Sequence, residues 1–129
     1  MTFPEDLKYS KEHEWVRVKG NVATVGVTDY AQDQLGEIVF VELPNEGEEF
    51  AKGEAFGVVE SVKSVNDVYV PVSGKIMEIN DPVVDSPEIV NEDPYSEGWL
   101  VKIEMSDPKD LKDLMTVTQY EAYIKEESE

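Results

Sequence analysis

Residues 55–72 read AFGVVESVKSVNDVYVPV, and this stretch decides the fold. Apolar side chains alternate with other residues on both sides of its middle, over residues 55–62 and again over residues 67–72. A period of two is typical of β-strands, and two such runs with little between them predict a β-hairpin. Lys63 then lies at the tip, where an enzyme can reach one amine and no other. The stretch therefore raises the hypothesis of a carrier protein.

The composition indicates one compact domain with an acidic surface. The chain has 129 residues, of which 40% are apolar, so we expect a single domain over residues 1–129. Its formal net charge of −18 argues against nucleic acids and anionic membranes as partners, because contacts with phosphate need lysine and arginine. Such a charge keeps a small protein soluble and monomeric, and it favours partners with basic patches. Charge alone favours the simpler alternative that the acidity serves solubility only.

The N-terminal sequence favours a cytoplasmic location. Residues 1–6, MTFPED, have neither the basic start and apolar run of a secretory signal nor the arginine richness of a transit peptide. No run of apolar residues approaches the length of a membrane span. The absence of cysteine fits a reducing compartment. We expect the cytoplasm of a bacterium, with the mitochondrial matrix as the alternative.

Other short strands are predicted on both sides of the lysine hairpin, which we place at about residues 54–80. The dipeptide Gly20-Asn21 separates two alternating runs and predicts a first hairpin. The run Ile38-Val39-Phe40-Val41 is apolar throughout, which predicts a strand buried on both faces. The predicted strands outside the lysine hairpin's tip are residues 15–19, 22–27, 38–41, 75–79 and 99–103.

Several short helices are also predicted, the last of them at the C-terminus over about residues 118–127. A helix near residues 28–35 would be capped by Asp29, with Gln32 three residues on, and stopped by Gly36. Thr118 and Glu121 have the spacing of a capping box. Two further helical pieces are expected at residues 86–90 and from Asp107-Pro108. This mixture predicts a mainly β barrel or sandwich with short helices.

The sequence lacks the residue constellations of an enzyme. His13 is the only histidine and cysteine is absent, which argues against a transition-metal site and leaves little scope for a serine triad. The chain has no Gly-x-Ser-x-Gly elbow and no phosphate-binding loop. Carboxylates are plentiful, but in so acidic a chain any chosen pair is best explained as solvated surface. We therefore expect a non-enzymatic binding or carrier module, with no catalytic residues and no metal site.

Five sequence motifs occur in an order and spacing that resemble one known family. They are His13-Glu14-Trp15, VGVTDYAQ at residues 25–32, LGEIVFVELP at residues 35–44, Glu60-Ser61-Val62-Lys63, and PYSEGWLVKI at residues 94–103. Together they cover roughly residues 7–125, and the chain thereby resembles the H-proteins of the glycine cleavage system. The combination is specific, whereas Glu-Ser-Val-Lys alone is weak. The resemblance implies a barrel-sandwich hybrid of the lipoyl-domain type, with lipoate in amide linkage to Lys63.

The resemblance also implies roles for three acidic residues, each with a simpler alternative. Glu14 would lie near the cleft where the loaded arm rests, or else be an exposed acid entering a strand. Glu60 and Asp67 would help the lipoate-attaching enzyme to recognise the hairpin, or else keep the sheet edge charged against aggregation. For His13 we expect packing against the first hairpin, and for Trp15 and Trp99 positions in the core. Lys63 has neighbours unlike the Ala-Met-Lys-Met of biotin carriers, which disfavours biotin.

By the same resemblance, the partners are the enzymes of glycine cleavage. A pyridoxal-phosphate glycine decarboxylase would load the aminomethyl group of glycine onto the lipoyl arm. A tetrahydrofolate-dependent aminomethyltransferase would unload it, and a dihydrolipoyl dehydrogenase that uses FAD and NAD would reoxidise the arm. The alternative is a lipoyl relay protein that acts in lipoate assembly or transfer and takes no part in glycine cleavage. The sequence barely separates these two functions.

Overall fold

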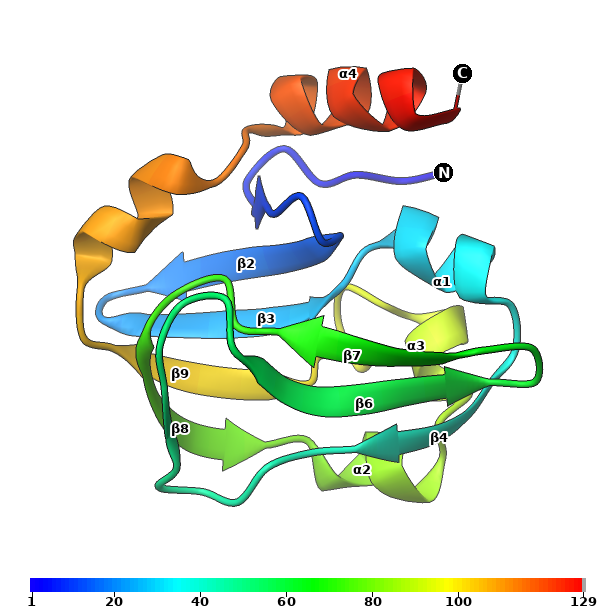
Figure 1. The fold of residues 1–129 in the computed structure, drawn as a ribbon, viewed down its shortest axis with the longest axis horizontal. Helices are drawn as coiled ribbons and strands as arrows, with labels where there is room; N and C mark the ends of the chain where they lie inside the picture. Colours follow the sequence, from blue (N-terminus) through cyan, green and yellow to red (C-terminus); the bar gives the residue numbers. More distant parts are fainter. Residues whose placement is uncertain (129) are drawn as a thin grey trace.

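The computed structural model describes residues 1–128, and it consists of two β-sheets with short helices around them (Figure 1). The larger sheet has the strand order β1-β2-β3-β9-β8-β5, and the smaller one has the order β4-β6-β7. Side chains from both sheets form one core cluster, so the sheets enclose the core between them. The strands are β1 (Lys8–Tyr9), β2 (Glu14–Lys19), β3 (Val22–Val27), β4 (Ile38–Glu42), β5 (Glu49–Phe50), β6 (Ala55–Ser61), β7 (Val65–Tyr69), β8 (Gly74–Ile79) and β9 (Val101–Met105).

Both predicted hairpins are present, but the lysine hairpin ends at Tyr69, because residues 74–79 of its expected range form β8 of the larger sheet. Strands β2 and β3 pair in antiparallel register around Gly20, whose φ of +62° suits the turn. Strands β6 and β7 pair likewise and leave only residues 62–64 between them. Gly57 lets β4 approach β6, because a Cβ atom at this position would lie 2.4 Å from the carbonyl oxygen of Glu42. The mainly β barrel-sandwich architecture follows from these pairings.

The prediction that residues 38–41 are buried on both faces is wrong. Ile38 and Val41 of β4 face the core, but Val39 and Phe40 are 48% and 45% exposed. The strand lies at the edge of the smaller sheet, and its pairing with β6 shifts between Ile38 and Phe40. This irregularity turns two successive apolar side chains outward, which an apolar run by itself does not reveal.

The first helix, α1 (Asp29–Leu35), begins and ends where expected but has a different cap. The Thr28 hydroxyl group, rather than the Asp29 carboxylate, accepts a hydrogen bond from the backbone N–H of Ala31. Asp29 instead accepts a hydrogen bond from the Gln32 side chain. Gly36 closes the helix with a φ of +79°, as predicted. The cap therefore lies one residue earlier than the sequence pattern indicated.

The helical piece predicted from Asp107-Pro108 is confirmed, with Asp107 as its cap, whereas the caps of two other helices differ from the predictions. Helix α4 has its capping box at Thr116 and Gln119, which exchange hydrogen bonds, and not at Thr118 and Glu121. Ser86 forms no side-chain cap, and the helix that follows it starts only at Ile89. The short helix at Asp81–Asp85, which precedes that helix, was not predicted. The helices after α1 are α2 (Asp81–Asp85), α3 (Ile89–Glu92), the 3₁₀ helix η1 (Pro108–Asp113) and α4 (Val117–Ser128).

A second, smaller core cluster fixes the two ends of the chain to each other. It consists of Leu7, Tyr9, Trp15 and Tyr120, and all four side chains are almost fully buried. Trp15 is thus a core residue, as expected, while Trp99 is partly buried beside this cluster. Figure 1 shows the result: α4 lies above the N-terminal segment and β2. None of the helices within residues 1–128 has both the length and the apolar character that crossing a membrane requires.

Candidate functional site

The turn that presents Lys63 is built by its nearest neighbours. The backbone N–H of Ser61 donates to the carbonyl oxygen of Ser64 at 2.8 Å and closes the hairpin. The buried Ser61 hydroxyl oxygen accepts hydrogen bonds from the N–H groups of Lys63 and Ser64, at 3.3 and 3.1 Å. Lys63 itself is exposed between them. Lys63 therefore stands exposed on an ordered turn.

The turn is also tied to the end of α1. The N–H of Val62 donates to the carbonyl oxygen of Glu37 at 3.1 Å. The Lys63 side chain lies over Gly36, because a Cβ atom at that glycine would lie 3.5 Å from Lys63 Cε. Among the described residues, no carboxylate lies within ion-pair distance of the lysine amine. The end of the Lys63 side chain thus lies near Gly36, and its amine forms no ion pair with the described residues.

A cleft of about 600 Å³ opens beside β7, close to this turn. Its walls come from distant parts of the chain, namely the segment before β2, the end of β3, α1, β7 and α4. Val65, two residues after Lys63, is part of the wall. The cleft is lined by Glu12, His13, Glu14, Val27, Tyr30, Ala31, Gln34, Leu35, Val59, residues 65–69 and Glu127.

Glu14 is buried in the wall of this cleft, so the alternative that it is an exposed acid is wrong. Its carboxyl group is held at both oxygens: the Ser10 hydroxyl group donates to Oε1 at 2.5 Å, and the N–H of Tyr69 donates to Oε2 at 3.3 Å. No lysine or arginine of the described chain forms an ion pair with it. Burial raises the pKa of Glu14 from about 4.5 to about 7, although both hydrogen bonds lower it. The cleft thus contains a buried acid without a cation.

Glu60 and Asp67 lie in the same small sheet but in different surroundings. Asp67 is exposed and belongs to the lining of the cleft. Glu60 lies outside the lining, half-buried between Phe40 and Val65, its partners on the neighbouring strands. The structure therefore groups Asp67 with Glu14, and it groups Glu60 with the exposed apolar side chains near the lysine turn.

His13 contacts the C-terminal helix and α1, not the first hairpin as predicted. Its Nδ1 lies 2.9 Å from the Tyr120 hydroxyl oxygen, and its Nε2 forms an ion pair at 3.0 Å with Glu127 when the ring is protonated. The Tyr120 oxygen lies 2.7 Å from the Thr28 hydroxyl oxygen, which caps α1. The backbone of His13 has a φ of +69°, which directs the chain sharply into β2. This hydrogen-bonded chain joins two walls of the cleft.

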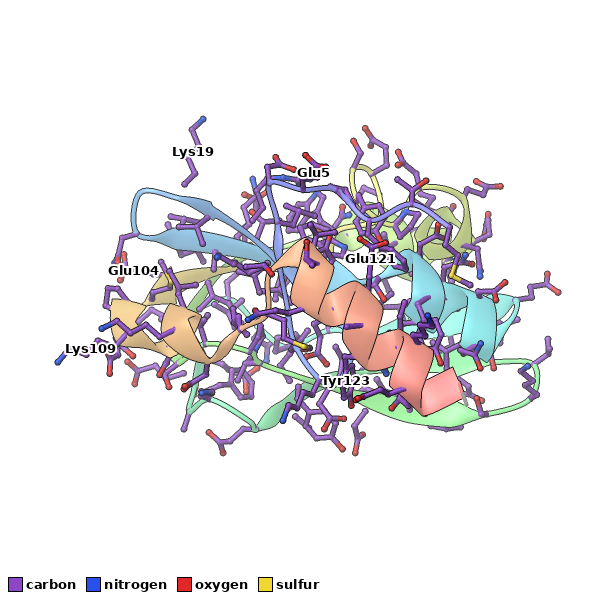
Figure 2. All side chains as sticks on the ribbon, turned by 90° about the horizontal axis from the view of Figure 1, so that it is seen from above. Glu5, Lys19, Glu104, Lys109, Glu121 and Tyr123 are labelled. Carbon is purple, nitrogen blue, oxygen red and sulfur yellow. The ribbon has the colours of Figure 1, made fainter. Side chains whose placement is uncertain are left out.

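Sequence patterns missed the residues that complete the site. Ser10, Tyr69 and Tyr120 have no motif of their own; Ser10 bonds to Glu14 four residues away, whereas the partners of Tyr69 and Tyr120 are distant in the sequence. The part of the chain that is described contains no group of three or more side chains placed to hold a metal ion. Figure 2 shows Lys19 and Lys109 extending from the end of the molecule formed by the β2–β3 turn and η1.

Comparisons with known proteins show the family and the fold. The model of the family "Glycine cleavage H-protein" matches residues 7–127. The glycine cleavage system H protein of Anaeromyxobacter sp. (strain K) is 56% identical, over 98% of this chain and 99% of its own. That of Carboxydothermus hydrogenoformans is 53% identical, over 98% and 97%. The crystal structure of a glycine cleavage system H protein from Mycobacterium marinum superimposes with a TM-score of 0.86 at 35% identity and covers 98% of this chain and 100% of that one. The chain belongs to the glycine cleavage H-protein family.

Proposed function

We propose that residues 1–129 act as a single lipoyl-carrier domain of the glycine cleavage system, with lipoate in amide linkage to Lys63. The carrier would take the aminomethyl group of glycine from the pyridoxal-phosphate decarboxylase to the tetrahydrofolate-dependent aminomethyltransferase. The dihydrolipoyl dehydrogenase, with FAD and NAD, would then reoxidise it. The observation that supports this most is the exposed lysine amine on an ordered turn beside a cleft that contains an unpaired buried acid.

The residues present fit the lipoyl group. The Lys63 amine is exposed and has no ion-pair partner in the described chain, so an attaching enzyme can acylate it. When bound, lipoate supplies a dithiolane whose sulfur accepts the one-carbon unit. Lysine and acyl chain together reach on the order of 10 Å. Val65 lies both next to the turn and in the wall of the cleft, so the arm can bend back into it.

Within the cleft, Glu14 would stabilise the cationic amine that the loaded arm presents. A carboxylate and an ammonium group form a strong charge-assisted hydrogen bond where water is scarce. Val27, Leu35 and Val59 contribute apolar wall that excludes water from the arm. Asp67 lies in the same lining and adds to the negative potential. The chain's own residues thus shelter and orient the group but break no bond.

The surface around the turn would serve recognition by the lipoate-attaching enzyme. Glu60 lies between Phe40 and Val65, which are 45% and 66% exposed. An acid flanked by exposed apolar side chains suits a partner surface with a basic residue in an apolar setting. The lipoate-attaching enzyme would recognise Asp67, on the same hairpin, together with Glu60. The protein itself is in this proposal a monomeric, cytoplasmic and non-enzymatic component that meets its partners briefly.

Two measurements test the function. The intact mass of protein made in cells that produce lipoate should show one lipoyl group, and the tryptic peptide should place it on Lys63. The holoprotein should then restore glycine cleavage to the three partner enzymes. A bare lysine in the presence of a competent ligase would refute the carrier function. A lipoylated protein that fails with the decarboxylase would instead support the lipoyl relay alternative.

A further inference from the structure

Ser10 and Glu14 are linked by three hydrogen bonds. The Ser10 hydroxyl group donates to Glu14 Oε1 at 2.5 Å, and the Ser10 hydroxyl oxygen also accepts a hydrogen bond from the Glu14 N–H at 3.0 Å. The N–H of Ser10 donates to the carbonyl oxygen of Glu14 at 2.9 Å. Ser10 is only 8% exposed and Glu14 only 2%. This short loop therefore fixes the carboxyl group before any ligand enters the cleft.

A hydroxyl group can serve both protonation states of its partner. Toward an ionised carboxylate it donates its own hydrogen, and toward a neutral carboxyl group it can accept the acid proton. The Ser10 oxygen has two lone pairs, of which the Glu14 N–H uses one. The other is available for the acid proton. No movement of the backbone is needed to change from one arrangement to the other.

We propose that Ser10 is a positioning residue that holds the Glu14 carboxyl group in both protonation states, so that the carboxyl group loses its proton when a cationic amine enters the cleft. In the empty cleft, burial raises the pKa of Glu14 to about 7, so the neutral acid and the carboxylate coexist near neutral pH. When an ammonium group arrives, the O–H bond of Glu14 breaks, the proton passes to water, and the carboxylate pairs with the ammonium group. Where Glu14 is neutral, the Ser10 hydroxyl group accepts its proton, and once that proton has left, the hydroxyl group donates to Oε1, as it does in the structure. The identity of the amine rests on the proposed function.

The other groups that face Glu14 favour the same ligand charge. The titratable residues in the lining are Glu12, His13, Tyr30, Asp67, Tyr69 and Glu127. Three of these are further acids, and Glu12 contributes to the raised pKa of Glu14 by charge repulsion. His13 is the one residue of the lining that can become a cation, and it lies against Glu127. A cleft with this lining attracts cations and repels anions.

The experiment is a pH titration of the apoprotein with carboxyl-¹³C glutamate, followed by NMR. The Glu14 signal is assigned by its loss in Glu14→Gln. We expect the Glu14 midpoint to rise by roughly one pH unit in Ser10→Ala, because the bond that Ser10 donates to the carboxylate is charge-assisted and stronger than the bond that it accepts from the neutral acid. Ser10→Thr keeps the hydroxyl group and should titrate like the wild type. Ser10→Cys keeps the volume but donates weakly, so its midpoint should lie between the two.

Proton release by Glu14 in the presence of a cationic amine is tested by the same titration in methylammonium chloride, with sodium chloride at the same concentration as the control. Methylammonium should lower the wild-type Glu14 midpoint, since it stabilises the carboxylate. An unchanged midpoint in Ser10→Ala, or equal midpoints in Ser10→Ala and Ser10→Thr, would overturn the role of Ser10. No effect of methylammonium would overturn the proton release. An unmodified Lys63 in the mass measurement would refute the carrier function without affecting the result of these titrations. Failure of the proposed function and failure of the role of Ser10 are therefore distinguishable.

Discussion

The lysine turn and the Glu14 cleft are assembled over very different distances along the chain. The hydrogen bonds that order the turn join Ser61 to residues two and three positions away. Those that form the cleft join Glu14 to Tyr69, 55 positions away, and His13 to Tyr120, 107 positions away. A site built locally can be recognised as a motif, whereas one built from distant segments exists only when the whole molecule is folded.

Burial separates the two regions as well. Lys63 is exposed, so its replacement should change chemistry and leave stability alone. Glu14 and Tyr120 are buried, and replacing either should change stability and cleft together. Four variants can sharpen or break this distinction.

The largest effect is expected at the turn. Lys63→Arg removes the amine that would be acylated, so lipoate attachment and glycine cleavage should both fall to background. The melting temperature should stay within a few degrees of the wild type, because no buried contact is lost. Intact mass, reconstituted turnover and thermal unfolding measure the three quantities. Lys75→Arg, at another exposed lysine, is the control, and retained glycine cleavage in Lys63→Arg would contradict the arm mechanism.

The next effect concerns Glu14 and depends on pH. The folded protein binds the Glu14 proton up to about pH 7, whereas an ordinary glutamate releases it near 4.5. Stability from this group is therefore present at pH 4.5 and below, and it is lost as the pH rises through 7. Glu14→Gln removes that loss. The unfolding free energy of the variant minus that of the wild type should therefore increase by on the order of 3 kcal/mol between pH 5 and pH 8.5.

Urea unfolding at the two pH values measures this difference. Glu46→Gln, an exposed turn residue, controls for the loss of one negative charge. A Glu14→Gln variant whose advantage is the same at both pH values would show that Glu14 is already ionised in the empty cleft.

A smaller effect is expected where α4 joins the cleft. Tyr120→Phe removes the hydroxyl group between His13 and Thr28, and we expect a loss of about 1–2 kcal/mol because buried polar groups are left unpaired. The amide of Ala31, at the capped start of α1, should exchange faster with solvent. Tyr123→Phe removes an exposed hydroxyl group from the same helix and is the matched control (Figure 2). Equal stability of the two variants would argue against the hydrogen-bonded chain.

The smallest effect should stay within the turn. Ser61→Ala removes the acceptor for the N–H groups of Lys63 and Ser64, at a cost of about 1 kcal/mol. Amide exchange at these two residues should speed up while exchange in the cleft stays unchanged. Ser96→Ala, at an exposed loop serine, is the control. Faster exchange at Tyr69 or Ala31 in Ser61→Ala would show that the two regions are coupled.

The successes and failures of sequence-based prediction follow the same division. The two hairpins were predictable because alternation and a tight turn depend on neighbouring residues. The caps of α1 and α4 were misplaced by one or two residues, since several polar residues compete for each position. The burial of residues 38–41 was wrong because an edge strand and an irregular pairing decide which side chains turn outward.

The sequence by itself determined the strand pattern, the lysine at the hairpin tip and the acidic character of the surface. Each depends on short-range geometry or on composition, which folding does not alter. Only the tertiary structure decided that Glu14 is buried with no cation among the described residues beside it, that the Tyr69 N–H reaches its second oxygen, and that Tyr120 joins the same region from a distant part of the chain. A carboxyl group takes its proton affinity from the burial and the donors around it, and these arise only when distant segments pack together.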